Sequence, residues 1–245
     1  MNRRSLSVLV LAAVALAGVQ ASARQNPSVD DIVAKNLQAK GGLEKIRAVQ
    51  TLKQTSKMSL PGGIVGTLTM YGKRPNMTRQ ELTLTAIGMT VINAFDGQTA
   101  WSVNPMQGMA TPTVVTGPMA ELVKEQSDFD GPLVDYKTKG YTVEFVGTET
   151  LGTRKVYHLK LTRKDQRVQH CYIDVETNLE TKTTGETPTG LAEQEMSDYR
   201  DVDGLKMPFL VRTIFGGVEQ VKIEVEKIEV NARFDDGVFK MPKGQ

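Results

Sequence analysis

The sequence predicts a mainly β protein, a single domain of about 11–12 antiparallel strands with an N-terminal helix and a short helical insertion. Most of the chain consists of runs rich in Thr, Val, Leu and Ile, in which apolar and polar residues alternate. Gly, Pro or Asn separates these runs, as in strands joined by tight turns. The run VKIEVEKIEV at 221–230 is typical, because its alternation gives a strand with one apolar and one polar face. Roughly 220 residues fit one all-β domain.

Residues 1–23 have the layout of a secretory signal peptide. The basic segment MNRR precedes the apolar run SLSVLVLAAVALAGV, and Ala21-Ser22-Ala23 is a cleavage site of the A-x-A type. The apolar run is shorter than the roughly 20 residues of a membrane-spanning helix, which disfavours an uncleaved anchor. We therefore expect cleavage after about Ala23 and a mature chain, residues 24–245, in the periplasm.

An amphipathic helix is expected at about 29–40. Ser28 is a good N-cap, acidic residues occupy the first turn, and Gly41-Gly42 ends the helical pattern. About five strands follow between 49 and 104, each bounded by turn residues.

Residues 118–136 interrupt the strand pattern with a helical insertion. Pro118 suits the first position of a helix, and Asp130 can cap a second short helix. The preceding stretch, 105–117, is rich in Pro and Gly and indicates a loop. Strand-like runs return from 141 to 230.

Charge and cysteine content exclude some classes of function. The chain has 30 Lys and Arg against 28 Asp and Glu, and loss of Arg3 and Arg4 with the signal peptide leaves 28 of each. A neutral chain without a basic block gives no reason to expect nucleic acid. Cys171 is the only cysteine, so an internal disulfide is excluded, and we expect it to be a small buried or half-buried side chain.

No catalytic or metal-binding motif is present. The sequence lacks a phosphate-binding loop, a G-x-S-x-G nucleophile motif and an H-E-x-x-H zinc motif. A metal site from His158, His170 and Cys171 would require aligned neighbouring strands, and adjacent residues 170 and 171 point to opposite faces of a strand. We therefore predict a non-enzymatic protein without a cofactor or metal.

A sheet of about a dozen strands must cover its apolar face, and one that curls into an open barrel buries that face in its own interior. Methionine is flexible and suits apolar contacts that must adapt. The methionines could fill an irregular core, or they could line a place for a flexible apolar ligand. Those of the first half are Met58, Met70, Met77, Met89, Met106, Met109 and Met119.

Three short motifs carry a resemblance to a known family. They are G-x-L-x-M-x-x-x-x-P-N at 66–76, D-G-x-x-x-W at 96–101 and D-Y-R-x-V-D-G-x-x-x-P at 198–208. With the order of the predicted elements, they make nearly the whole mature chain resemble the periplasmic lipoprotein-carrier fold of the LolA/LolB-like superfamily, which includes outer membrane lipoprotein-sorting proteins.

The resemblance implies an unclosed β-barrel whose apolar interior takes acyl chains of lipoprotein or lipid beneath a helical lid. It also implies a monomer that exchanges cargo with inner- or outer-membrane donor and acceptor proteins. An arginine on an early strand holds the lid in that family, and Arg79 is the nearest candidate here. The inward candidates are Leu60, Leu68, Met70, Leu84, Met89, Val91, Trp101 and Val103, and the rim and lid candidates are Met106, Met109, Met119, Leu122, Val123, Leu133 and Tyr136.

Two alternatives remain open. A non-enzymatic envelope interaction module would have a barrel filled with side chains. An envelope hydrolase with a scattered acidic site would have a polar cleft with convergent carboxylates. The chemistry of the interior separates these functions.

Overall fold

The computed structural model describes residues 26–187 and 190–242. In these ranges it contains a 13-stranded antiparallel sheet and the helices α1 (Val29–Ala39), α2 (Leu43–Ala48) and α3 (Gly117–Gln126). The strands are β1 (Thr51–Leu60), β2 (Ile64–Lys73), β3 (Met77–Leu84), β4 (Met89–Phe95), β5 (Ala100–Asn104), β6 (Met109–Val114), β7 (Thr142–Leu151), β8 (Arg154–Thr162), β9 (Val168–Asp174), β10 (Glu180–Thr187), β11 (Gly190–Val202), β12 (Leu205–Phe215) and β13 (Val218–Val230). The predicted signal peptide lies outside the described residues.

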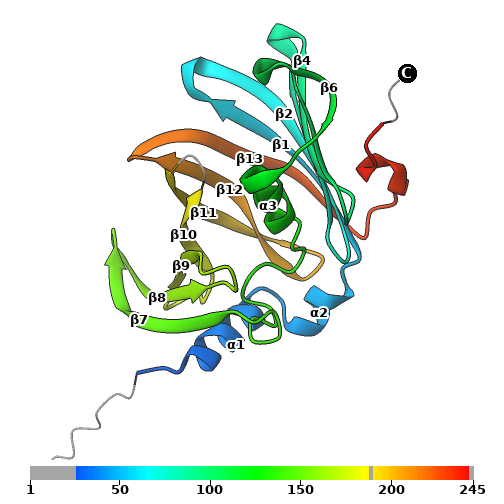
Figure 1. The fold of residues 1–245 in the computed structure, drawn as a ribbon. Coiled ribbons are helices and arrows are strands. Elements are labelled where there is room, and N and C mark those ends of the chain that lie inside the picture. The colour runs from blue at the N-terminus through cyan, green and yellow to red at the C-terminus, as the bar shows by residue number, and fades with distance from the viewer. Residues whose placement is uncertain (1–25, 188–189, 243–245) are drawn as a thin grey trace, which may run out of the picture.

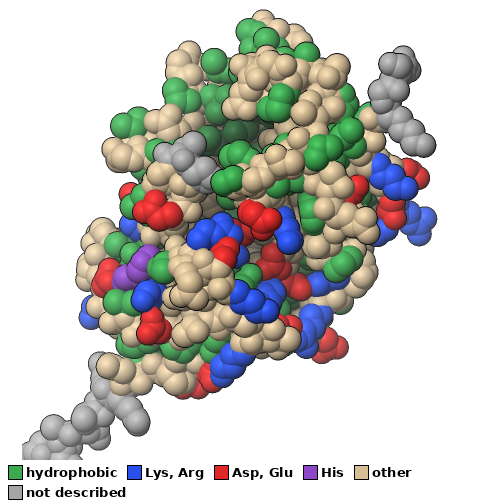
Figure 2. All heavy atoms as spheres, viewed as in Figure 1, with side chains coloured by type: hydrophobic (Ala, Val, Ile, Leu, Met, Phe, Trp, Pro, Cys, Tyr) green, Lys and Arg blue, Asp and Glu red, His purple; other side chains and the backbone are tan. Residues whose placement is uncertain are grey.

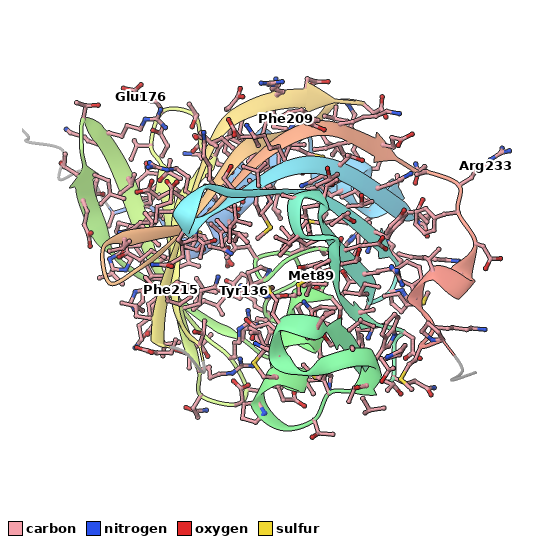
Figure 3. The ribbon with its side chains drawn as sticks, turned by 90° about the horizontal axis from the view of Figure 1, so that it is seen from above. Met89, Tyr136, Glu176, Phe209, Phe215 and Arg233 are labelled. Carbon is pink, nitrogen blue, oxygen red and sulfur yellow. The ribbon has the colours of Figure 1, made fainter. Side chains whose placement is uncertain are left out.

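The sheet is an unclosed barrel. Its strand order is β6-β5-β4-β3-β2-β1-β13-β12-β11-β10-β9-β8-β7, so β6 and β7 form the two edges although they are consecutive in the chain. The segment between them, residues 115–141, must therefore cross from one edge to the other. Figures 1 and 3 show the sheet curving round and α3 lying across its open side. The mainly β, open-barrel prediction is confirmed.

Two local predictions are wrong. Residues 109–114 form the edge strand β6 rather than a loop, and Pro112 is tolerated there because an edge strand needs only one row of hydrogen bonds. The second short helix at 130–136 does not form, since this stretch is a series of turns. Gly131 and Asp135 have φ of 74° and 51°, which a right-handed helix does not accommodate.

Helix α1 fills one half of the barrel. The Ser28 side chain accepts a hydrogen bond from the Asp31 amide and so fixes the start of the helix. The buried Ile32 and Val33 pack in a cluster with side chains from β8, β9 and the crossing segment. The other members of this cluster are Leu133, Tyr136, Leu159, Leu161, Cys171 and Ile173.

A β-bulge changes which residues of β13 face inward. Val225 pairs with Ser56, but the next register pair is Lys227 with Thr55, so Glu226 is the extra residue. The bulge shifts the phase by one, and Ile228 therefore joins Ile223 and Val225 on the concave face. The helices in the described part of the chain are too short or too polar to span a bilayer.

Candidate functional site

Two adjoining cavities lie between the concave face of the sheet and α3. We call the larger, of about 590 Å³, the main chamber, and the smaller, of about 330 Å³, the end chamber. They form one continuous hollow, because they share the lining residues Leu52, Gln54, Met70, Gln126, Met207 and Pro208. Volumes of this size are typical of small-molecule sites.

The main chamber is lined by apolar and uncharged side chains. Its apolar residues come from six strands, β1–β4, β12 and β13, and include Leu52, Met58, Leu68, Leu82, Val91 and Ile223. Among the described residues, no Asp, Glu, Lys, Arg or His lines it, and its polar side chains are the amides of Gln54, Gln80, Asn93, Gln126 and Gln194. Charged residues appear only in the end chamber, where Lys40, Asp128, Asp130 and Lys206 contribute. The main chamber is therefore suited to an apolar ligand.

Helix α3 is held across the opening by different forces at its two sides. Val123 is buried and packs against Phe95 and Ala100 on the β4–β5 side. Toward the opposite edge, Glu125 forms ion pairs of 2.6 Å with both Arg163 and Arg167, beside the β8–β9 turn. The helix thus bridges the two halves of the open barrel.

The chain after α3 is fixed by a second arginine contact. Arg74, in the β2–β3 turn, forms a bidentate pair with Asp130 at 2.5 and 2.6 Å, and this hydrogen bonding raises the pKa of its guanidinium. The same guanidinium lies over the ring of Phe129 at 4.9 Å. That ring approaches Gly72 so closely that a Cβ there would lie 3.2 Å from it. Arg74 therefore couples the crossing segment to β2.

Several predicted site residues do lie on the concave face. Leu68, Met70 and Val91 line the main chamber. Leu84 and Met89 form a cross-strand pair next to the lining pair of Leu82 and Val91, two residues along each strand, and so face the same side. Leu60 lies two residues after the lining residue Met58 on β1 and also faces this side. Figure 3 shows Met89 on the concave side of the sheet.

Trp101 and Val103 lie on the opposite, convex face, which corrects the inward assignment. Asn93, a lining residue, pairs with Ser102, so the neighbours of Ser102 point outward. The Trp101 indole donates a 2.7 Å hydrogen bond to the carbonyl of Phe239, and its side chain is fully buried under the C-terminal segment.

Arg79 is also on the convex face, so it is not placed to hold α3. It contacts Glu81 at 2.6 Å, donates to the Val238 carbonyl at 3.2 Å and lies over the Trp101 ring at 5.6 Å. Among the described residues, the arginines that form ion pairs with the crossing segment are Arg47, Arg74, Arg163 and Arg167.

The rim and lid candidates are dispersed. Leu133 and Tyr136 belong to the core beneath α1, and Val123 packs on the sheet instead of facing the chamber. Met106 and Met119 are 54% and 49% exposed, and Met109 is partly exposed on β6. Leu122 lines a small hollow with Gln126, Arg163 and Gln194 beside the main chamber. Figure 2 shows apolar side chains around a hollow at the end formed by the β2, β4 and β6 hairpins.

Sequence reasoning missed several chamber residues. Leu82 could have been identified from the alternation of apolar and polar residues along its strand. The inward orientation of Met207 depends on strand pairing and that of Ile228 on a bulge, and neither is visible in the local sequence pattern. The amides of Gln80 and Asn93 gave no signal, because a polar residue in an alternating strand is normally assigned to the wet face.

A histidine pair lies outside this site, on the convex face of β8 and β9. His158 Nε2 is 2.6 Å from His170 Nδ1, and His158 Nδ1 is 2.5 Å from Glu149. Desolvation, then the charges of His158 and Lys160, lower the pKa of His170. Cys171 faces the opposite way into the core, as predicted, and burial raises its pKa. Within the described ranges, no group of three or more acidic, His or Cys side chains is placed to hold a metal ion.

Comparisons with known proteins identify the fold. No family model matches the chain, and the search of curated proteins found no match. Among solved structures, a DUF1329 family protein from Desulfovibrio piger matches with a TM-score of 0.62 at 14% identity, over 86% of this chain and 97% of that one. A LolA superfamily protein from Nitrosomonas europaea matches with a TM-score of 0.57 at 13% identity, over 85% and 96%.

A third similar structure is described as an outer membrane lipoprotein-sorting protein domain from Vibrio parahaemolyticus. It matches with a TM-score of 0.59 at 10% identity, over 85% of this chain and 94% of that one. At these identities the likeness concerns the fold alone. The chain therefore has the fold of LolA-superfamily and lipoprotein-sorting domains along most of its length.

Proposed function

We propose that this protein is a non-enzymatic, exported carrier that holds acyl chains of a lipid or lipoprotein in the main chamber. The observation that carries the proposal is a charge-free, apolar chamber of about 590 Å³ on the concave face of an open barrel. The likeness to LolA-superfamily folds supports it. A chamber of this kind favours a carrier over an interaction module with a filled barrel.

Burial of an acyl chain supplies enough free energy for binding without a charged anchor. A chain of about fifteen methylenes, at about 0.8 kcal/mol for each buried CH₂, gains on the order of 12 kcal/mol before costs. Association and ordering of the ligand cost several kcal/mol or more. The remainder is consistent with reversible binding, as a carrier requires.

Nothing in the main chamber favours hydrolysis. Its polar side chains are amides, which cannot act as general acids or bases at neutral pH. Among the described residues, no pair of carboxylates lines it. The signal peptide predicted at 1–23 supports a periplasmic location for the proposed carrier, where membrane proteins would act as cargo donors and acceptors.

A charge placed in the chamber tests the proposal. Met70 lines both chambers, and we expect Met70→Glu to weaken binding of a BODIPY-labelled acylglycerol by about tenfold or more, because a carboxylate there loses its hydration or displaces the chain. Fluorescence titration measures the affinity. The matched control is Thr67→Glu, an exposed position on the same strand that points to the convex face and pairs with Lys57.

Affinity that is unchanged in Met70→Glu, with circular dichroism equal to that of the unmodified protein, would contradict the proposed chamber. Failure of the unmodified protein to bind any acyl probe would contradict the carrier function itself.

A further inference from the structure

We infer that the acyl ligand carries an uncharged ester or amide group, which Gln80 and Asn93 contact inside the main chamber. The inference rests on the proposed carrier function and specifies its ligand class. It starts from the arrangement of the chamber amides, of which Gln54, Gln80 and Asn93 are aligned across neighbouring strands.

The strand register places one row of concave-face residues side by side across β1 to β5. Gln54 pairs with Met70, Met70 with Gln80, Gln80 with Asn93, and Asn93 with Ser102. We call these five residues the amide row. Four of the five have polar, uncharged side chains, and the row crosses the whole β1–β5 half of the chamber.

The adjacent row toward the β1–β2 hairpin is apolar where it lines the chamber. Leu68 pairs with Leu82, and Leu82 with Val91, and all three line the main chamber. A polar band at one level of an apolar wall matches a ligand with one polar group and a hydrocarbon chain. With the polar group at the amide row, the chain would lie along the leucines.

The amide row retains hydrogen-bonding capacity toward the chamber. The Gln54 amide donates to Ser56 Oγ at 3.0 Å, which leaves its carbonyl oxygen as an acceptor. The Asn93 amide oxygen accepts a hydrogen bond of 2.9 Å from Ser102 Oγ, which leaves the Asn93 NH₂ group as a donor. In the described part of the chain, the Gln80 side chain makes no hydrogen bond to protein. Because an amide in apolar surroundings is stabilised by a polar partner, a ligand carbonyl that bonds to Gln80 gains affinity.

The charge distribution selects against an ionised group at this level. The nearest lysines of the hollow, Lys40 and Lys206, line only the end chamber and already face Glu180 at 3.5 Å and Asp201 at 3.8 Å. A carboxylate at the amide row would be a desolvated charge without a counterion, which is costly. An ester or amide carbonyl has no net charge, and a hydrogen bond from a side-chain amide compensates for its lost hydration.

Two competing ligands with the same acyl chain distinguish a preference for an uncharged group from a preference for an ionised one. Displacement of the BODIPY-labelled acylglycerol is measured at pH 8 with 1-palmitoylglycerol, an ester, and with palmitate, which is ionised. We expect the ester to bind about tenfold more tightly, the equivalent of one or two hydrogen bonds. Equal or tighter binding of palmitate would overturn the inference and leave the carrier function standing. Failure of both competitors would instead contradict the carrier function.

Substitutions assign the preference to the amide row. Gln80→Leu with Asn93→Leu is expected to lower the ester-to-palmitate affinity ratio toward one, and a ratio that stays near tenfold would overturn the assignment. Gln80→Lys supplies a cation and is expected to reverse the preference in favour of palmitate, a gain that loss of folding cannot mimic. A Gln80→Lys variant that folds and still prefers the ester would also contradict the inference.

Discussion

Trp101 ties the C-terminal segment to the convex face of the sheet. Its indole bonds to the Phe239 carbonyl, and Phe239 is fully buried against the sheet. Phe234 completes this outer cluster through edge-to-face contacts with Tyr71 at 5.4 Å and with Phe239 at 5.8 Å. The single tryptophan is therefore a structural anchor on the side of the sheet away from the chamber.

This placement predicts how Trp101 fluorescence responds to a ligand. Bromine quenches tryptophan only on close approach, so an acyl probe brominated along its chain should saturate the protein and leave Trp101 emission nearly unchanged. Steady-state fluorescence with brominated and plain acylglycerol measures this. Strong quenching by the brominated probe alone would show that the acyl chain lies against Trp101, contrary to the assignment of the chamber to the concave face.

His170 makes stability depend on pH. Its pKa in the folded protein lies below the ordinary value of 6.5, because burial and the neighbouring His158 and Lys160 disfavour its charged form more than Glu149 favours it. As pH falls through about 6.5, the unfolded chain takes up a proton that the folded chain does not, so the free energy of unfolding decreases.

Urea unfolding of the unmodified protein and His170→Gln between pH 7.5 and 5, in steps of about half a unit, tests this linkage. We expect the difference in unfolding free energy between the two proteins to change in favour of His170→Gln as the solution becomes more acidic. Parallel curves over the whole range would show that His170 has the same pKa in both states.

The sequence predicted which face of the sheet a side chain occupies only where apolar and polar residues alternate along a complete strand. Leu68 and Met70 follow from the alternation of β2, but the short β5 offers no internal evidence for which of Trp101 and Ser102 faces inward. The family resemblance implied that Trp101 faces inward, whereas the pairing with Asn93 places Ser102 on the inner face. Burial of Trp101 by a C-terminal segment 138 residues later is a non-local contact that local pattern does not contain.

The crossing segment of residues 115–141 depends on ion pairs at its attachment points. Arg74 and Asp130 have side chains only 20% and 19% exposed, so removal of one partner costs more than it does in an exposed pair. It fixes the chain that leaves α3 and so restricts displacement of the helix from the chamber.

Loosening this pair should speed exchange of the ligand. We expect Asp130→Asn to raise the dissociation rate of the fluorescent acylglycerol about threefold to tenfold in stopped-flow displacement, because the segment opens at lower cost. The control is Asp198→Asn, which removes the partner of Arg200 in an exposed pair on β11 and should leave the rate unchanged. Equal rates in all three proteins would show that the Arg74 contact does not limit ligand exchange.

Elements with strong periodicity were predicted, and those set by context were not. The N-cap and acidic first turn placed α1 within a residue of its observed bounds, and the alternating runs correspond to twelve of the strands. Strand β6 was missed because it contains Pro112. Proline is tolerated in an edge strand but not in a central one, and the sequence does not show which strand lies at the edge of the sheet. The second short helix was wrong because Gly131 and Asp135 adopt positive φ to turn the chain back under α1.

The whole molecule divides into a filled half and a hollow half of one continuous sheet. Antiparallel pairing of β1 with β13 joins the two halves, while α1 and residues 133–136 fill the half built from β7 to β10. The half built from β1 to β5 is covered by α3 and by the residues just after it, and it retains the main chamber. The methionines indicated either an irregular core or a place for a flexible apolar ligand. Which half of the barrel is filled depends on the path of the crossing segment, which the sequence pattern does not reveal.

The central claim is that this chamber carries an acylated ligand. The most direct measurement is native mass spectrometry of the protein purified from periplasm without detergent, followed by organic extraction and lipid analysis of the same sample. We expect a stoichiometric bound mass that extracts as an acylated lipid or lipopeptide and that is absent from Met70→Glu. Protein that is free of any bound mass, and that takes up no acylglycerol when incubated with vesicles containing it, would contradict the account.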